Sequence, residues 1–283
     1  MKNKYSSKLR DAVPLPKSPQ SIARSLVRHF YLDLNALLNK KDEGNFLRCI
    51  YCHYVFDDQK EKFEQLIKTL LSIGTFVDTA TCIHILQGKI PLDQKYFHLS
   101  FDDGFRNNFL NAIPILGKLK VPAIFFVPSS LISAEWDRAY NYCLETMHYS
   151  GVIETLKRDD ALKMIELGFE IGSHTKTHTR FSDISQDSIL LEQEIKGSKD
   201  EIEYLTGVEC KYISWPFGKL TDADDKSLYA VMKAGFTACF GAYRGSVVPG
   251  KTDLFSIPRH LFETQWPVSH TLYFLRGNME VNH

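Results

Sequence analysis

Residues 97–105 read Phe-His-Leu-Ser-Phe-Asp-Asp-Gly-Phe, and this stretch places two adjacent carboxylates directly after an apolar run. The run at 97–101 predicts a buried strand, and the glycine at 104 predicts a turn where that strand ends. Asp102 and Asp103 are costly to bury unless a cation or a hydrogen-bond network compensates them. The pair therefore indicates a site with a chemical role.

A second polar motif follows another apolar run further along the chain. Residues 168–178 read Gly-Phe-Glu-Ile-Gly-Ser-His-Thr-Lys-Thr-His, which ends on two histidines at i and i+4. One carboxylate and two imidazoles form a three-ligand set for a borderline divalent metal and leave a position open for water or substrate. We predict Asp103, His174 and His178 as metal ligands. Asp102, the remaining carboxylate, is then the predicted general base for hydrolysis.

Short apolar runs alternate with stretches of helical period from about residue 46 onward, which predicts βαβ units and a parallel sheet. Most polar motifs fall at the carboxyl ends of these runs, the rim where parallel barrels carry active sites. An open doubly wound sheet also places them on one edge, so this pattern alone does not separate the two topologies. The predicted strands are 47–52, 97–101, 122–127, 168–172, 210–214, 235–240 and 254–258, and the predicted helices are 59–74, 108–119, 159–167, 187–206 and 222–234.

The first 45 residues precede this alternation and predict an N-terminal helical extension, with the barrel domain occupying residues 46–283. Residues 21–40 have helical spacing of apolar side chains, which we expect to pack on the barrel. A membrane-surface helix is the alternative, and Asp33 at the edge of the stripe disfavours it. The apolar stripe consists of Ile22, Leu26, Phe30, Leu34 and Leu37.

Composition excludes several classes of function. Lys plus Arg and Asp plus Glu are both 34 in the 283 residues, so no overall field favours nucleic acid. The basic N-terminus has no following apolar segment, and no apolar stretch reaches 18 residues, so we expect a cytoplasmic protein without a transmembrane segment. The six cysteines lie mostly in apolar runs, which favours reduced core thiols; Cys49 and Cys52 form a C-x-x-C that we interpret in the same way.

Two features stay open at this stage. His53 follows the first predicted strand and is either a rim residue or a buried core histidine. The long link at 129–158 is rich in aromatic side chains and is either a lid over the site or a surface excursion with its own helix.

The motifs resemble the polysaccharide deacetylase family, also known as the NodB-homology or carbohydrate esterase family 4 group. Their order and spacing agree with that family over most of residues 47–262. The matching segments are Ile50-Tyr51-Cys52-His53-Tyr54-Val55, Leu99-Ser100-Phe101-Asp102-Asp103-Gly104, Val121-Pro122-Ala123-Ile124-Phe125-Phe126-Val127, Gly172-Ser173-His174-Thr175-Lys176-Thr177-His178 and Trp215-Pro216-Phe217-Gly218. The resemblance implies a distorted (β/α)7 barrel and metal-dependent removal of an acetyl group from a sugar, usually with zinc and sometimes with cobalt or nickel. By motif, Asp102 looks like the base, and the metal ligands are the three residues predicted above.

The sequence departs from the family in two places. Many members carry an arginine two residues before the proline of the third motif, where it orients the catalytic carboxylate, and Ser214 occupies that position here. We hypothesise that Arg259 supplies this charge from across the rim. The family's late Leu-x-His pattern, which carries the general acid, is also absent. His260 is the preferred candidate and His270 the second, because a predicted strand delivers His260.

The sequence thus predicts a cytoplasmic metal-dependent deacetylase acting on an N-acetylated sugar. A nucleotide-linked or lipid-linked precursor of a surface glycan is the expected substrate, because no export signal is evident. Trp215 and Phe217 follow a strand end and are the candidates for stacking on a sugar ring. Two alternatives remain: hydrolysis of another acyl amide, such as a formyl group, and a non-catalytic sugar-binding barrel.

Overall fold

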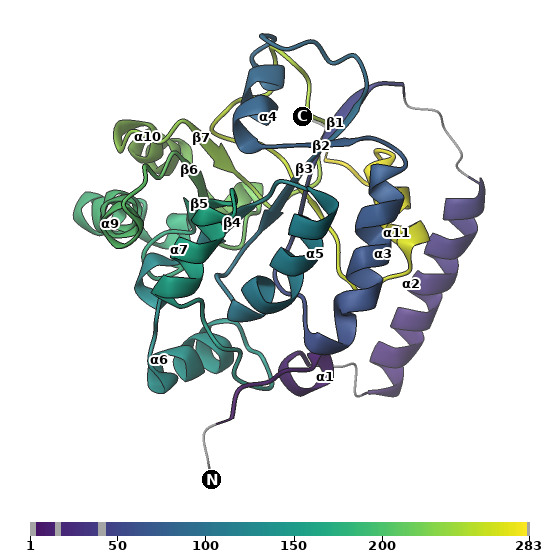
Figure 1. The fold of residues 1–283 in the computed structure, drawn as a ribbon, viewed down its shortest axis with the longest axis horizontal. Helices are drawn as coiled ribbons and strands as arrows, with labels where there is room; N and C mark the ends of the chain where they lie inside the picture. The colour runs from purple at the N-terminus through teal and green to yellow at the C-terminus, as the bar shows by residue number, and fades with distance from the viewer. Residues whose placement is uncertain (1–3, 15–17, 39–43, 282–283) are drawn as a thin grey trace.

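The computed structural model describes residues 4–14, 18–38 and 44–281. Its centre is one parallel sheet with strand order β7-β6-β5-β4-β3-β1-β8, and β2 pairs with β3 beside this path (Figure 1). The sheet curls into a barrel with helices on its outside. The strands are β1 Phe46–Cys52, β2 Thr75–Val77, β3 Lys95–Phe101, β4 Ile124–Val127, β5 Glu170–Ser173, β6 Tyr212–Ser214, β7 Ala238–Phe240 and β8 His260–Leu261.

The helices are α1 Leu9–Ala12, α2 Pro19–Leu38, α3 Lys60–Leu71, α4 Thr79–Leu86, α5 Ile113–Leu119, α6 Trp136–Asn141, α7 Arg158–Glu166, α8 Phe181–Ile184, α9 Ser188–Thr206, α10 Asp225–Lys233 and α11 Val268–Leu275. Helices α2, α3, α5, α7, α9 and α10 lie within one or two residues of periodic segments predicted from the sequence or inside them, and the other helices are additional. A π-helical turn at Asn108–Ala112 precedes α5 and completes the helix predicted at 108–119. Among the described residues, no helix is both long and apolar enough to cross a bilayer.

Alternation along the strands divides the core into two layers. Ile50, Leu99 and Phe125 point outward and pack with the surrounding helices. Ile124 and Phe126 point into the barrel, where they join a smaller apolar cluster. Each strand therefore has buried side chains on both faces, as the continuous apolar runs of the sequence indicate.

Residues 257–261 close the barrel. Phe240 and Ile257 form a parallel bridge, and the Gly241 amide donates to the Ile257 carbonyl. On the other side, β8 pairs in parallel with β1 through Ile50 and His260. This segment joins the two edges of the sheet, which confirms the distorted barrel over an open doubly wound sheet. The strand predicted at 254–258 is displaced, because only Ile257 of that run pairs and the paired strand starts at His260.

The elements that the sequence did not predict include α8, α11 and the neighbouring pair β2 and α4. Only a few polar residues, Asp78, Thr79 and Thr81, separate the apolar side chains of β2 from those of α4, which hides the change from strand to helix. The helix start is marked by Asp78, whose carboxylate accepts the Thr81 amide as an N-cap. These two elements bring Cys82 into the barrel interior, within the smaller apolar cluster.

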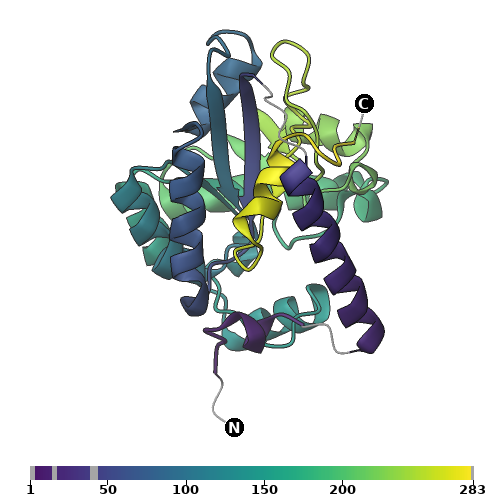
Figure 2. The same ribbon diagram turned by 90° about the vertical axis from the view of Figure 1, so that its right-hand side faces the viewer.

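Helix α2 packs beside α11, as Figure 2 shows for the purple and yellow helices. The contact uses Leu32 against Tyr273 and Phe274. Phe30 is 72% exposed and Leu34 45% exposed, so the predicted stripe is wrong at these two residues. The side chains of Ile22, Leu26 and Leu37 lie outside the described residues. The helix turns a different face inward because the Asp33 carboxylate pairs with His270 of α11, with Oδ1 2.7 Å from Nε2.

The link at 129–158 has its own helix α6 and packs on a satellite core with the N-terminal segment. Phe56, Phe105 and Tyr142 are buried in this cluster together with Ala12 of α1. The link therefore forms a wall next to the rim, and it brings Tyr142 against His178, with ring centroids 5.5 Å apart.

Two glycines in this fold should respond to alanine with opposite signs. A Cβ at Gly172 of β5 would lie 2.6 Å from Phe126 Cδ1, whereas one at Gly197 of α9 meets nothing closer than 3.9 Å. We expect Gly172→Ala to lower the free energy of unfolding by about 1–3 kcal/mol through overpacking. Gly197→Ala, the control, should raise it by about 0.5–1 kcal/mol through helix propensity. Urea denaturation measures both changes, and a neutral Gly172→Ala would contradict the close approach.

Candidate metal and acid–base site

The polar motifs converge on one rim because the strands that carry them are parallel. Asp102 and Asp103 follow β3, and His174 follows β5. Ser214 ends β6, and Arg259 precedes β8 at the seam of the barrel. All five residues are at most 3% exposed. Chemistry at this rim therefore takes place in a largely desolvated environment, where electrostatic interactions are strong.

Asp103, His174 and His178 lie together in metal-ligand geometry. Asp103 Oδ1 is 3.6 Å from His174 Nε2 and 3.3 Å from His178 Nε2. One donor atom from each residue lies within 4.8 Å of the other two. Asp103 Oδ2 is buried and has no hydrogen-bond partner among the described residues, a costly state that a bound cation would relieve. The donor set of one carboxylate and two imidazoles fits a divalent metal.

The protonation states also suit a metal. Burial lowers the pKa of His174 to about 4, so its imidazole is neutral near pH 7. Burial opposes ionisation of Asp103, but the hydrogen bond from His178 and the charge of His53 outweigh it and hold the pKa of Asp103 well below its usual value. His174 Nδ1 lies 2.7 Å from the Ser214 carbonyl oxygen and donates to it. This bond leaves the Nε2 lone pair directed at the site.

The turn that carries the histidines is strained and braced. Thr175 and His178 have φ values of 64° and 65°, in the left-handed region that β-branched and bulky residues rarely adopt. The Glu194 carboxylate of α9 accepts the backbone amides of Lys176 and Thr177 at 3.1 and 2.9 Å. Glu194 thus fixes the turn from outside the barrel.

The same kind of strain recurs at two other rim residues. Asp103 has a φ of 71° and Phe217 a φ of 63°. Left-handed non-glycine residues cost free energy and persist where their surroundings hold them. Four of the eight described non-glycine residues with positive φ therefore lie at this rim.

Arg259 holds Asp102 from across the rim. Its Nη1 and Nη2 donate to the two Asp102 carboxylate oxygens at 2.8 and 2.7 Å. Nη2 also donates to Ser214 Oγ at 2.6 Å, and Nη1 to Ser100 Oγ at 2.9 Å. Burial opposes ionisation of Asp102, but the Arg259 guanidinium outweighs it and holds the pKa of Asp102 below its ordinary value. Asp102 is therefore an ionised, oriented carboxylate beside the metal ligands.

Known proteins share the sequence pattern and the fold of this chain. The sequence profile described as "Polysaccharide deacetylase" matches residues 89–239. The chain belongs to the polysaccharide deacetylase family. A poly-beta-1,6-N-acetyl-D-glucosamine N-deacetylase of Staphylococcus aureus is 27% identical over 237 residues, which are 77% of this chain and 74% of that relative. YxkH of Bacillus subtilis is 24% identical over 179 residues, and the match spans 62% of this chain but only 56% of the relative's length.

Solved structures share the fold of this deacetylase. IcaB from Ammonifex degensii superposes with a TM-score of 0.67 at 20% identity, covering 82% of this chain and 97% of that one. The Streptococcus pyogenes deacetylase PplD superposes with a TM-score of 0.62 at 18% identity, covering 81% and 96%. These matches confirm the distorted (β/α)7 barrel, and the family places the protein among metal-dependent hydrolases.

Two residues predicted for the site of this deacetylase lie elsewhere. His260 Nε2 is 3.2 Å from Glu280 Oε1, on the outer side of β8, because neighbouring strand residues point to opposite faces and Arg259 points inward. His260 is therefore not placed to act as the general acid.

Trp215 is only 1% exposed and packs against Tyr243, so its ring is not available to a sugar. Phe217 is 39% exposed, and its ring lies 4.9 Å from that of His178.

His53 is the rim residue that sequence reasoning left undecided. It follows β1 and is half-buried. The Asp102 carboxyl has a lowered pKa mainly because of Arg259, against the effect of burial, and the charge of His53 adds to this lowering. His53 also acts electrostatically on Asp103 and on the half-buried Glu263. The alternation that points Cys49 and Tyr51 into the barrel predicts an inward His53 as well. The two-residue alternation of the first predicted strand, continued to residue 53, would have placed His53 at the rim.

The Arg259–Asp102 pair should show strong energetic coupling. We expect Arg259→Met to lower the free energy of unfolding by about 3–5 kcal/mol, because it leaves a buried carboxylate unpaired. In a protein that also carries Asp102→Asn, Arg259→Met should lower the free energy of unfolding by an amount that is smaller by at least about 1 kcal/mol. Lys196→Met, which removes an exposed pair with Asp200, is the control and should cost under about 1 kcal/mol. Urea denaturation of the four cycle members measures the coupling, and additive effects would contradict it.

Proposed function

We propose that this protein is a metal-dependent N-deacetylase that hydrolyses the N-acetyl group of an amino sugar in a glycan. The observation that carries the proposal is Asp102, an ionised carboxylate that Arg259 holds through both oxygens. It lies beside the Asp103, His174 and His178 ligand set. A binding protein has little use for an oriented base next to a metal site.

Asp103, His174 and His178 would hold the metal, which we propose is zinc, with cobalt or nickel as functional substitutes. When bound, the metal supplies polarisation of the acyl carbonyl and a more acidic water. Asp102 accepts the proton from the attacking water. Arg259 acts through Asp102 and is a positioning residue, because its guanidinium fixes the carboxylate plane and keeps the group ionised before substrate binds.

The leaving amine needs a proton donor, and we assign this role to His53. It is the histidine at the rim that is both partly open to solvent and close enough to act on both carboxylates. Glu263 is half-buried and interacts electrostatically with His53; burial raises the pKa of its carboxyl, and His53 opposes that rise. The rim thus carries a base and an acid in different surroundings, as hydrolysis of an amide requires.

The surroundings of the rim suit a saccharide. Phe217 presents an exposed ring beside His178 and is the remaining candidate for stacking on a sugar. A cavity of about 660 Å³ borders the histidine turn, and its polar lining includes Ser130, Arg138, Asn141, Lys176 and Thr177. The Staphylococcus aureus relatives support a β-1,6-linked N-acetylglucosamine polymer as substrate. Nucleotide-linked and lipid-linked precursors, and the cytoplasmic location expected from the sequence, remain predictions.

The activity is tested by acetate release from poly-β-1,6-N-acetylglucosamine oligomers, chito-oligomers, and nucleotide- and lipid-linked N-acetyl sugars. We expect release that stops on chelation and returns with zinc. Asp102→Asn should lower kcat by about 100-fold or more, because the amide cannot accept the proton. Asp159→Asn, an exposed carboxylate at the start of α7, is the matched control and should retain full rate. Absence of release from every substrate would contradict the proposal.

The role of His53 is tested with leaving groups of different basicity. His53→Gln should lower kcat for an N-acetyl sugar by about 100-fold while leaving hydrolysis of 4-nitrophenyl acetate nearly unchanged, because a phenolate leaves without a proton. His84→Gln, an exposed histidine on α4, is the control for both substrates. Equal losses on the two substrates would show that His53 acts by another route.

A further inference from the structure

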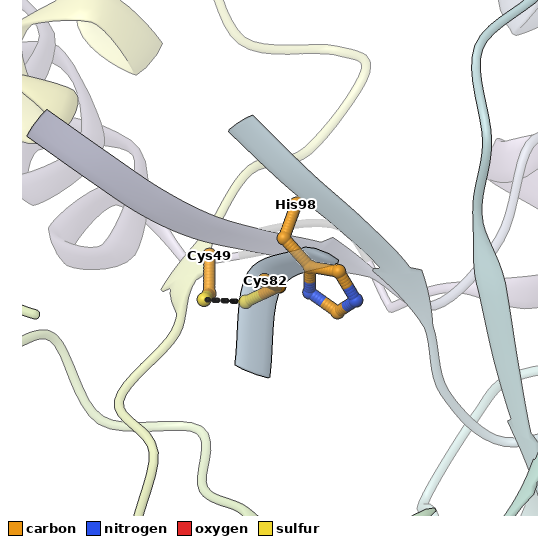
Figure 3. Close-up of side chains that lie close together, drawn as sticks. All are labelled: Cys49, Cys82 and His98. Atoms are coloured by element: carbon orange, nitrogen blue, oxygen red, sulfur yellow. Dashed lines mark hydrogen bonds between the residues drawn. The ribbon is translucent and has the colours of Figure 1, made fainter. Parts of the chain in front are cut away.

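A second cluster of metal-ligating side chains lies inside the barrel below the rim. It consists of Cys49 on β1, Cys82 on α4 and His98 on β3 (Figure 3). His98 precedes Asp102 by four residues on the same inward face, a separation of about 13 Å along the strand. The cluster is therefore distinct from the Asp103, His174 and His178 set.

The two sulfur atoms are spaced as in a metal site. Cys49 Sγ and Cys82 Sγ are 3.7 Å apart, and one donor atom from each of the three residues lies within 4.8 Å of the others. Two thiolates bound to one tetrahedral zinc at 2.3 Å have their sulfur atoms about 3.8 Å apart. Both cysteines are fully buried and His98 is nearly so.

His98 has an unused ring nitrogen on the side of the sulfur atoms. Its Nε2 lies 3.0 Å from Thr79 Oγ1, and its buried Nδ1 has no hydrogen-bond partner among the described residues. Figure 3 shows one ring nitrogen facing the two cysteines and the other facing away. When Nε2 carries the proton and donates to Thr79, the Nδ1 lone pair points toward the thiols. This is the second-shell arrangement of a histidine ligand.

We propose that Cys49, Cys82 and His98 form a second, structural zinc site, in which they supply three of the four ligands of a tetrahedral ion and a neutral water would be the fourth. Charge favours a divalent ion: two thiolates, a neutral imidazole and Zn²⁺ sum to zero, whereas a monovalent copper ion leaves a net negative charge. Neutrality matters because the cluster lies among apolar side chains, including Leu47, Phe126 and Phe240.

The two thiols hydrogen-bond to each other. This bond lowers the pKa of Cys49 and raises the pKa of Cys82, while burial opposes ionisation of both thiols and His98 lowers the pKa of Cys49 further. Zinc binding would displace the proton of each thiol. The site joins β1, β3 and α4, so the ion would fix α4 to the base of the barrel. Because the cluster is closed, we infer that it is loaded as the chain folds.

Cobalt substitution tests the site separately from the rim. The full-length protein is produced with cobalt in place of zinc, and its absorption and metal content are measured. Thiolate ligation gives an intense sulfur-to-cobalt charge-transfer band in the near ultraviolet, which carboxylate and imidazole ligands do not give. We expect about two metal ions per chain and this band in the unmodified protein. His178→Ala should lose one ion and keep the band.

Variants of Cys82 and His98 should lose the metal ion that His178→Ala keeps. Cys82→Ala and His98→Gln should each lose one ion, and Cys82→Ala should lose most of the band. Cys52→Ala, a buried cysteine on the outer face of β1, is the matched control and should keep both. Circular dichroism identifies variants that fail to fold, and His98→Gln tests the site without removing a thiol. The proposal is overturned by a folded chain without the band, by a band unchanged in Cys82→Ala, or by a Cys49–Cys82 disulfide in the folded protein.

Discussion

The site depends on one buried guanidinium. Arg259 is fully buried, and all five of its N–H groups find acceptors: the Asp102 carboxylate takes two, and Ser100, Ser214 and the Gly241 carbonyl take one each. These acceptors belong to β3, β6 and the end of β7, while Arg259 itself lies in the segment that closes the barrel. One side chain therefore fixes the Asp102 carboxylate, the proposed general base, and joins the two edges of the sheet. Removing its charge would disturb both fold and chemistry, because a buried carboxylate without its partner is far more costly than the pair.

Ser214 contacts both Arg259 and a predicted metal ligand. Its hydroxyl accepts from Arg259 at 2.6 Å, and its carbonyl accepts from His174 Nδ1 at 2.7 Å. An arginine at 214 would place a second cation where Arg259 already lies. The small serine instead connects the base to a metal ligand through two atoms of one residue. The charge that orients Asp102 thus comes from Arg259, which directly precedes β8, and Ser214 connects the proposed base with the proposed metal ligands.

The sequence identified the parts of the site that local motifs carry. Asp102 and Asp103 follow a long apolar strand, and His174 and His178 share one short turn, so spacing alone brings them to one rim. His260 was misplaced because β8 is only two residues long, and a pattern so short does not reveal which of two neighbours faces inward. Arg259 takes the inward position and His260 the outward one. Trp215 was misjudged because a residue after a strand end can also turn into the core. The elements β2 and α4 were missed because only a few polar residues separate their apolar side chains.

The barrel interior is organised in layers of increasing polarity toward the rim. At its base, Cys49 and His98 lie among aliphatic and aromatic side chains. One step higher on β3, Ser100 accepts from Arg259, and above it Asp102 and Asp103 face the rim. The inward residues His98 and Ser100 of β3 are thus polar, whereas the outward residues Phe97, Leu99 and Phe101 are apolar. A strand whose inner face carries His98, Ser100 and Asp102 loses apolar core on that side. The guanidinium network compensates for that loss with satisfied polar contacts, whereas in the thiol–imidazole cluster His98 Nδ1 has no hydrogen-bond partner among the described residues.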